Sequence, residues 1–524
     1  GQDEDYNLNS TLTALSQKRN AGIALYTSHR QRDAYDYNDD NFSELPSLKN
    51  NSFGLNSFFN LNENQKLQAN FSSMYEYRYG GELTDQPAYL ARQSEERTHN
   101  VLMGGVDYEI TNDDFNTSGS VYIAGQLTQR KHFTGIVPDD PLERQQYNNN
   151  PPYGNSKNYT FQVGGQLNHV IEDFIRGSNT LTFGAEYKID DVYDEIEAYD
   201  YLIDQNARNF GVFLQSDWMV SNKTTLLTGL RADKHNFVDK IIVNPRISLL
   251  YKPGSLSQLR LSWSTGFRAP QAFDADMHIA FAGGGIKTIE LAENLKEERS
   301  QSWSASYNWD KPNQDHIFGF TVEGFYTRLK NAFILEEMGT TAQGNSIMAK
   351  RNGQSSQVYG TTLELRANYN RKFQLEGGLT LQKSLYSAPV AWSEEIPGTK
   401  NYLRTPDTYG YYTFTWLPTS RFQAALSGIY TGSMIIPHYG LAGDPGTPEK
   451  DNLFESPDFL DVTLRFSYRF SSQRLDSSVE LFAGAANLLN DYQDQFDTGK
   501  NRDSGFVYGP AKPRTFFIGL KLFN

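Results

Sequence analysis

The strongest constraint on the fold is the final segment of the chain, residues 513–524. Apolar side chains occupy every second position there, at Phe516, Ile518, Leu520 and Leu522, with a further aromatic ring at Phe523. Successive side chains of a β-strand point to opposite faces, so the segment predicts a strand with one wholly apolar face. Such a strand at the very end of a chain is typical of a membrane barrel, in which an open edge cannot remain in lipid.

The overall polarity of the chain excludes a helical membrane protein. Of the 524 residues, 38% are hydrophobic, and the mean hydropathy is -0.60. No run approaches the ~18 consecutive apolar residues that a membrane helix needs. A transmembrane barrel tolerates this polarity because only alternate residues of each strand face lipid. The 32 Tyr, 33 Phe and 6 Trp residues suit the aromatic girdles of such a barrel.

Alternation with period two recurs along the whole chain. In residues 460–470, for example, Leu460, Val462 and Leu464 alternate with Asp461, Thr463 and Arg465. A face that carries charges suits a wide polar lumen and would be intolerable in the core of a soluble sandwich. The pattern gives no reason to divide the chain, so we expect one transmembrane β-barrel domain over residues 1–524.

Short turns alternate with long connecting segments. The short turns lie at 17–20, 62–65, 111–114, 221–223, 253–255, 370–372 and 417–420. The long segments are 34–50, 79–98, 131–156, 267–298, 332–354, 387–403, 432–457 and 490–509. Sorting of connections by length is typical of outer-membrane barrels, which have short periplasmic turns and long extracellular loops.

The strand count predicts a partner for the last strand. The pattern indicates about 21 antiparallel strands, the first of which covers about residues 5–16, and bacterial single-chain barrels have an even number. We therefore expect about 22 strands in the complete barrel, with one strand before Gly1. A barrel this wide is not filled by its own side chains and is typically plugged. No stretch resembles a plug, so we expect a plug domain from a missing N-terminal part or another chain.

Three places in the sequence resemble the β-barrel of TonB-dependent receptors. Residues 508–523 are similar to the terminal strand of that family, and residues 484–492 to the strand before it. Residues 266–271, followed by 293–300, resemble two paired sequence boxes of the family. The chain departs from the pattern at Asn524, where an aromatic residue is usual, and at Glu293, where the family has Asn-Pro.

The resemblance implies an outer-membrane receptor that imports a scarce metal chelate: a ferric siderophore, haem or cobalamin. It further implies a multi-pass protein of a Gram-negative outer membrane, in contact with lipid, a plug domain and the TonB energy-transducing complex. An ungated diffusion porin, and a surface receptor barrel that works with a lipoprotein partner, remain as alternatives. We expect no enzyme, because nucleophile-elbow, zinc-helix and phosphate-loop motifs are absent. The net charge of -14 argues against nucleic acid as a partner.

One acidic loop carries oxygen ligands at closely spaced positions. They are Asp36, Asn38, Asp40 and Glu44, and Phe42 offers a carbonyl. Hard cations collect carboxylates at such spacing, so the loop is a candidate structural calcium site. The alternative is a solvated acidic loop tip. No cofactor for catalysis is expected.

The segment between the two paired boxes holds the candidate ligand-binding residues. They are Arg268, Phe273, Asp274, Asp276 and His278. Haem receptors of the resembled family carry a ligating histidine in this interval, and imidazole is a good iron ligand. The alternative for His278 is an ordinary loop histidine that contacts Asp274 or Asp276.

Overall fold

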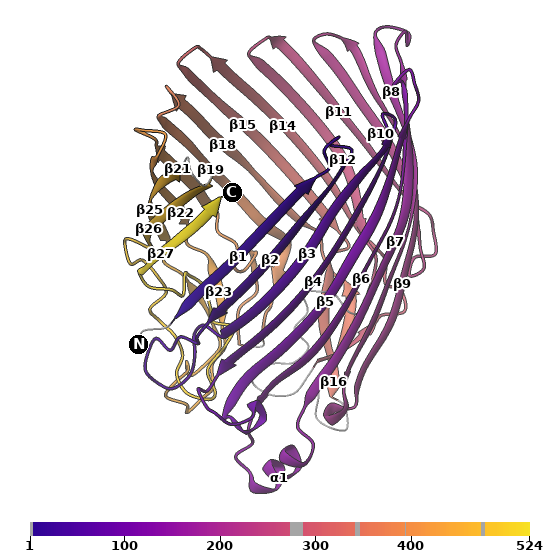
Figure 1. Cartoon of the computed structure of the whole chain (residues 1–524). Helices are drawn as coiled ribbons and strands as arrows, with labels where there is room; N and C mark the ends of the chain where they lie inside the picture. The colour runs from indigo at the N-terminus through magenta and orange to yellow at the C-terminus, as the bar shows by residue number, and fades with distance from the viewer. Residues whose placement is uncertain (1–3, 273–286, 341–345, 394, 473–476, 524) are drawn as a thin grey trace.

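The computed structural model describes residues 4–272, 287–340, 346–393, 395–472 and 477–523. Antiparallel strands form one 22-stranded sheet that curves into the wall of a barrel (Figure 1). A three-stranded sheet and a two-stranded sheet lie in the connections between wall strands. The predicted all-β antiparallel barrel is thus confirmed.

The wall strands follow one another in chain order. The first eleven are β1 (Asp5–Leu15), β2 (Ala21–Arg32), β3 (Ser47–Asn62), β4 (Gln65–Gly81), β5 (Gln93–Thr111), β6 (Thr117–Ile136), β7 (Tyr153–Ile171), β8 (Ser178–Ile196), β9 (Tyr201–Ser221), β10 (Thr224–His235) and β11 (Ile242–Gly254). The others are β12 (Ser257–Arg268), β14 (Glu298–Pro312), β15 (His316–Lys330), β18 (Ser356–Tyr369), β19 (Phe373–Val390), β20 (Thr399–Asn401), β21 (Thr408–Trp416), β22 (Phe422–Thr431), β25 (Phe459–Ser472), β26 (Ser477–Ala486) and β27 (Thr515–Phe523).

The remaining elements lie in the long connections. They are β13 (Lys287–Leu291), β16 (Phe333–Thr340), β17 (Ser346–Asn352), β23 (Ile435–His438), β24 (Asn452–Glu455), the helix α1 (Pro141–Asn149) and the 3-10 turns η1 (Ala88–Leu90) and η2 (Glu197–Tyr199). Asp140 caps α1 by accepting from the backbone N–H groups of Leu142 and Glu143, as helix N-termini require. No helix in the described part of the chain is long and apolar enough to cross a membrane.

The connections are sorted by length as the sequence predicts. Every predicted short turn joins two wall strands, and the long connections, including α1, gather at the other end of the barrel (Figure 1). We call these the short-turn end and the long-loop end. The long segments are more ordered than the sequence indicates: β4 and β5, for instance, extend well into residues 79–98. Period-two alternation fades there because consecutive residues are buried, as at His132, Phe133 and Thr134 on β6.

The two faces of the wall differ as the alternation predicts. Lumenal side chains form polar pairs between strands, such as Ser248 with Ser262 and Thr362 with Thr380. On β27 the outward side chains Phe516, Ile518, Leu520 and Leu522 are all more than half exposed, and Phe523 is 40% exposed. These residues form an apolar outer face that suits lipid.

The two edge strands, β1 and β27, run in the same direction. The path from β1 to β27 contains 21 strands when the three-residue β20 is left out, and each strand is antiparallel to the next. Figure 1 shows the arrows of β1 and β27 pointing the same way. Within the described residues β1 pairs with β2 and β27 with β26, not with each other. The barrel could close with antiparallel pairing only if one further strand, running in the opposite direction, lay between β1 and β27. That further strand stays a prediction.

A glycine on β27 tests how tightly the last hairpin is packed. The Phe482 ring on β26 lies where a side chain at Gly519 would stand. We expect Gly519→Val to destabilise the barrel by about 1–3 kcal/mol through overpacking. The unfolding temperature in detergent, followed by gel migration, measures this. Gly324→Val on β15 is the control because open space surrounds Gly324; an equal loss in both variants would contradict the packing argument.

Candidate functional site

Basic side chains cross the lumenal face of β2–β6 near the long-loop end. In one row the register places Arg78 opposite Arg97 and Arg97 opposite His132, with Arg32 two strands before Arg78. A second row lies two residues deeper and holds Arg30, His99 and Arg130. We call these seven residues the basic belt. It concentrates guanidinium groups at one side of the lumen in a chain of net charge -14.

Most arginines of the belt are neutralised by carboxylates that leave them partly exposed. Arg30 binds Asp5 at 2.9 Å. Arg78 binds Glu76 at 2.7 Å and Arg97 binds Glu95 at 2.6 Å, with 52% and 25% of the two arginine side chains exposed. Solvated ion pairs are worth little. An anion entering the lumen can therefore compete for these guanidinium groups at small cost.

One carboxylate anchors the far end of the belt and is fully buried. Asp194 Oδ1 accepts from the Ser156 hydroxyl and lies 3.2 Å from His132 Nε2 and 3.6 Å from an Arg130 nitrogen. Ser156 and His132 are both bound to Asp194, whereas in a hydrolase triad the serine hydroxyl forms a hydrogen bond with the histidine ring. The cluster beside the apolar residues Ile196, Tyr201 and Ile203 therefore holds the belt in place.

A small cavity lies between the belt and the loops. Its volume is about 210 Å³, and the residues that line it include Arg78, Arg97 and Arg502 together with Glu95 and Gln93. Gln93 is 4% exposed, and its buried Nε2 has no hydrogen-bond partner. Charge-assisted hydrogen bonds favour a carboxylate or similar oxyanion among such donors. The cavity can accommodate one anionic group of a larger ligand.

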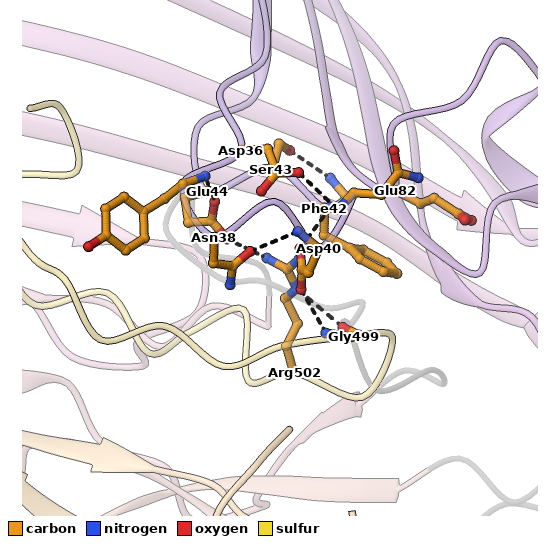
Figure 2. Close-up of polar contacts among 12 residues, drawn as sticks. Asp36, Asn38, Asp40, Phe42, Ser43, Glu44, Glu82, Gly499 and Arg502 are labelled. Carbon is orange, nitrogen blue, oxygen red and sulfur yellow. Dashed lines mark hydrogen bonds and ion pairs between the residues drawn. The ribbon is translucent and has the colours of Figure 1, made fainter. Parts of the chain in front are cut away.

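The acidic loop is built around Arg502 (Figure 2). The guanidinium of Arg502 lies 2.9 Å from Glu44 Oε1 and 3.1 Å from Asp40 Oδ1. Asp40 also accepts from the backbone N–H of Gly499 at 2.8 Å. Phe42 is fully buried, with Arg502 at 4.6 Å from its ring centroid. We call Asp40, Phe42, Glu44 and Arg502 the loop clamp.

The other oxygens of the loop mostly accept from the loop's own backbone. Asp36 accepts from Asn41 N–H, Asn38 from Asp40 N–H and Glu44 from Tyr37 N–H. Burial raises the pKa of Glu44 above its ordinary value, against the lowering effects of the Tyr37 N–H group and Arg502. Arg502 thus supplies a positive charge where the sequence suggested calcium. No group of three metal-binding side chains occurs in the described residues, and calcium binding stays a prediction.

The loop clamp joins connections that emerge from opposite sides of the β1–β27 edge. Residues 33–46 follow β2, and residues 487–514 precede β27. Tyr37 packs near Tyr492 and Phe496, with ring centroids 5.6 Å and 5.5 Å away. Lys512 binds Asp5 at 2.9 Å between the beginnings of β27 and β1. These contacts hold the two edges at a fixed separation at the long-loop end.

Of the five predicted ligand-binding residues, Arg268 lies in the described structure. It ends β12, with its guanidinium 3.8 Å from Glu298 and 5.8 Å from the Phe333 ring centroid. Phe273, Asp274, Asp276 and His278 lie outside the described residues. Ligand contacts by all five stay predictions.

Sequence reasoning missed the basic belt and Arg502. A signal existed for the belt, because Arg30, Arg32, Arg78, Arg97 and Arg130 stand near the long-loop ends of β2, β4, β5 and β6. Arg502 gave no such signal, since its partners lie more than 450 positions away in the chain.

Residues 5–488 match the family described as TonB dependent receptor-like, beta-barrel. The chain therefore belongs to this family, whose members are transport receptors and not enzymes.

Solved structures agree on the fold. The chain is similar to a variant ferric enterobactin receptor of Pseudomonas aeruginosa in complex with enterobactin, with 16% identity and TM-score 0.72, over 99% of this chain and 78% of the receptor. It is also similar to the siderophore receptor PirA of Acinetobacter baumannii, with 14% identity and TM-score 0.71, over 99% and 77% of the two chains. No curated protein sequence matches the chain.

Removing the charge of Arg502 tests the loop clamp. We expect Arg502→Gln to leave two largely buried carboxylates without their cation, a loss of about 3–5 kcal/mol for a buried pair. Residues 33–46 should then exchange amide hydrogen faster and become sensitive to protease. Lys500→Gln is the matched control in the same connection, because its partner Asp139 is 82% exposed.

A chelator separates the arginine from the predicted calcium. If Arg502 supplies the charge, removal of divalent cations should leave the protease resistance of residues 33–46 unchanged in the wild type. Loss of resistance on chelation, together with an undisturbed Arg502→Gln variant, would instead support calcium at Asp36, Asn38, Asp40 and Glu44.

Proposed function

We propose that the protein is a Gram-negative outer-membrane receptor that imports an anionic ferric chelate, of the siderophore class. The observation that carries this proposal is the basic belt at the long-loop end of the lumen. Family membership supports receptor-mediated transport. The similar structures include siderophore receptors, which favours a siderophore over haem or cobalamin.

The charge distribution supports an acidic ligand. The belt gathers five guanidinium groups inside the mouth, and carboxylates pair with four of them, so its attraction for an anion depends on exchange of those partners. The belt arginines present planar groups that bind carboxylate and similar oxyanions with two parallel hydrogen bonds. Their existing partners are partly solvated, so exchange for a ligand anion is inexpensive.

The cavity beside Arg78, Arg97 and Arg502 supports a defined contact for one group of the chelate. Its 210 Å³ is smaller than the 300–1,000 Å³ typical of drug-sized ligands, so most of a chelate would lie in the open lumen. The Nε2 of Gln93, which has no hydrogen-bond partner, adds a neutral donor to Arg78 and Arg97, whereas Arg502 is already bound by Asp40 and Glu44. Ligands that offer an oxyanion should therefore bind better than neutral ones.

Transport by this mechanism requires a plug domain in the lumen and the TonB complex as energy source. A wide barrel supports this, because its own side chains do not fill it. The same proposal includes a surface lipoprotein partner, which would help to bind the chelate outside the cell. An ungated porin would carry the same belt as a selectivity filter but would show no saturable high-affinity binding.

Neutralising the belt tests the proposed ligand chemistry. Arg78→Gln and Arg97→Gln should each weaken binding of a ferric catecholate or carboxylate siderophore about tenfold or more, since hydrogen bonds to charged groups contribute about 1.5–3 kcal/mol. Fluorescence-quenching titrations with ferric siderophore, haem and cobalamin measure this. Arg371→Gln, in the turn between β18 and β19, is the charge-matched control at the other end of the barrel.

Three outcomes would count against the proposal. Equal affinity of wild type and belt variants for every acidic chelate would remove the belt from ligand binding. Saturable binding of haem or cobalamin alone would replace the siderophore with another member of the family's ligand classes. Binding weakened equally by Arg371→Gln would indicate a general charge effect.

A further inference from the structure

The small cavity between the basic belt and the loops presents hydrogen-bond donors to whatever enters it. Gln93 lines the cavity, is 4% exposed and has no hydrogen-bond partner for its buried Nε2. Ser43 lines it as well, and its hydroxyl oxygen accepts from the Gly81 N–H group at 3.0 Å, which leaves the hydroxyl hydrogen to donate. A buried donor without an acceptor is costly, so the cavity favours a group that brings acceptors.

The arginines of the cavity add further donors, although each already has a carboxylate partner. Glu95, which also lines the cavity, binds Arg97 at 2.6 Å, and Arg78 has a similar partner on its own strand. A guanidinium has more N–H groups than one carboxylate can accept. The Arg78 and Arg97 side chains remain 52% and 25% exposed. A second oxyanion can therefore share or replace these solvated partners at small cost.

An ionised carboxylate is the group that best suits such a lining. It accepts hydrogen bonds at both oxygens and donates none, whereas hydroxyl, amide and ammonium groups bring hydrogens of their own. Its flat shape also matches the planar guanidinium group. The cavity volume of about 210 Å³ admits a terminal group of this kind and leaves the body of a chelate in the lumen.

Iron coordination decides which chelates can offer this group. In a hexadentate catecholate chelate every catecholate oxygen binds iron, so a ring that entered the cavity would present C–H groups to Gln93. A site built from donors rejects such a group because its own polar atoms stay unpaired. Among the described residues no aromatic side chain lines the cavity to stack on the ring. A polycarboxylate chelate, in contrast, keeps carboxylates that do not bind iron.

The walls of the cavity are in place before a ligand binds. Ser43 and Pro46 come from residues 33–46, which the loop clamp holds. The Arg32 guanidinium donates to the Pro46 carbonyl oxygen at 2.8 Å. Gly81 has φ of 103°, and a Cβ there would meet the Gln93 carbonyl oxygen, so the backbone approaches closely at this point. Donors fixed in this way discriminate between ligand groups more sharply than mobile ones.

We propose that Gln93 and its cavity select a chelate with a carboxylate that does not bind iron, and thus a polycarboxylate siderophore over a hexadentate catecholate. Gln93 Nε2 donates to one carboxylate oxygen, and Arg78 and Arg97 bind the same group. Gln93 is thereby a specificity-determining residue. The proposal rests on the proposed function and deepens it by naming the subclass of siderophore.

Fluorescence-quenching titrations of the full chain with ferric citrate, ferric enterobactin and haem test the proposal. We expect the wild type to bind ferric citrate about tenfold or more tightly than ferric enterobactin, a catecholate without a free carboxylate. Gln93→Leu removes the donor and should weaken ferric citrate about tenfold while ferric enterobactin stays unchanged. The ratio of the two Kd values is the readout, because damage to the fold weakens both chelates.

Gln374→Leu is the matched control, because Gln374 lies on β19 near the short-turn end, opposite Asn368 and Thr415. It should keep the Kd ratio of the wild type. Ferric enterobactin bound as tightly as ferric citrate, or a ratio that Gln93→Leu leaves unchanged, overturns the inference and leaves the proposed siderophore receptor intact.

Haem separates the two proposals, because its propionate carboxylates do not bind iron. Binding of haem alone, weakened in Gln93→Leu, retains the selection of a free carboxylate and rejects the siderophore of the proposed function. Failure of all three chelates to bind rejects both proposals.

Discussion

The ladder of hydrogen bonds between neighbouring strands is the constraint on which the whole structure depends. A backbone N–H or C=O group left unpaired in hydrocarbon costs several kcal/mol, so a strand in a membrane must pair on both sides. That requirement turns the chain into one continuous antiparallel sheet. It also fixes alternate side chains to opposite faces, which lets a chain of mean hydropathy -0.60 present an apolar wall outside and charged groups inside.

The same alternation decides where charge can accumulate. Arg78 and Arg97 are opposite each other in the sheet, and their repulsion is tolerated because Glu76 and Glu95 pair with them on the lumenal face. Water in the lumen screens such pairs, whereas lipid outside would not. A belt of arginines can therefore exist only on the inner face.

The edges of the sheet and its long connections depend on each other. β1 and β27 run in the same direction and do not pair in the described structure, yet the loops on either side are joined by Arg502 with Asp40 and Glu44. Two carboxylates and a guanidinium are largely buried together here, and removing one partner is costly because it leaves the other charges buried and unpaired. The loop clamp thereby fixes the separation of the edges at the long-loop end.

The sequence by itself determined the barrel, because period-two alternation and turn residues are local: the first strand, the predicted short turns and the outward face of Phe516, Ile518, Leu520 and Leu522 all follow from neighbours in the chain. Only the tertiary structure decided which distant groups meet. Arg502 joins Asp40 across more than 450 residues, and Arg78, Gln93 and Arg502 line one cavity only because two strands and a distant connection lie side by side. Contacts of this kind depend on how strands and loops that are distant in the chain are placed in space, which no local pattern encodes.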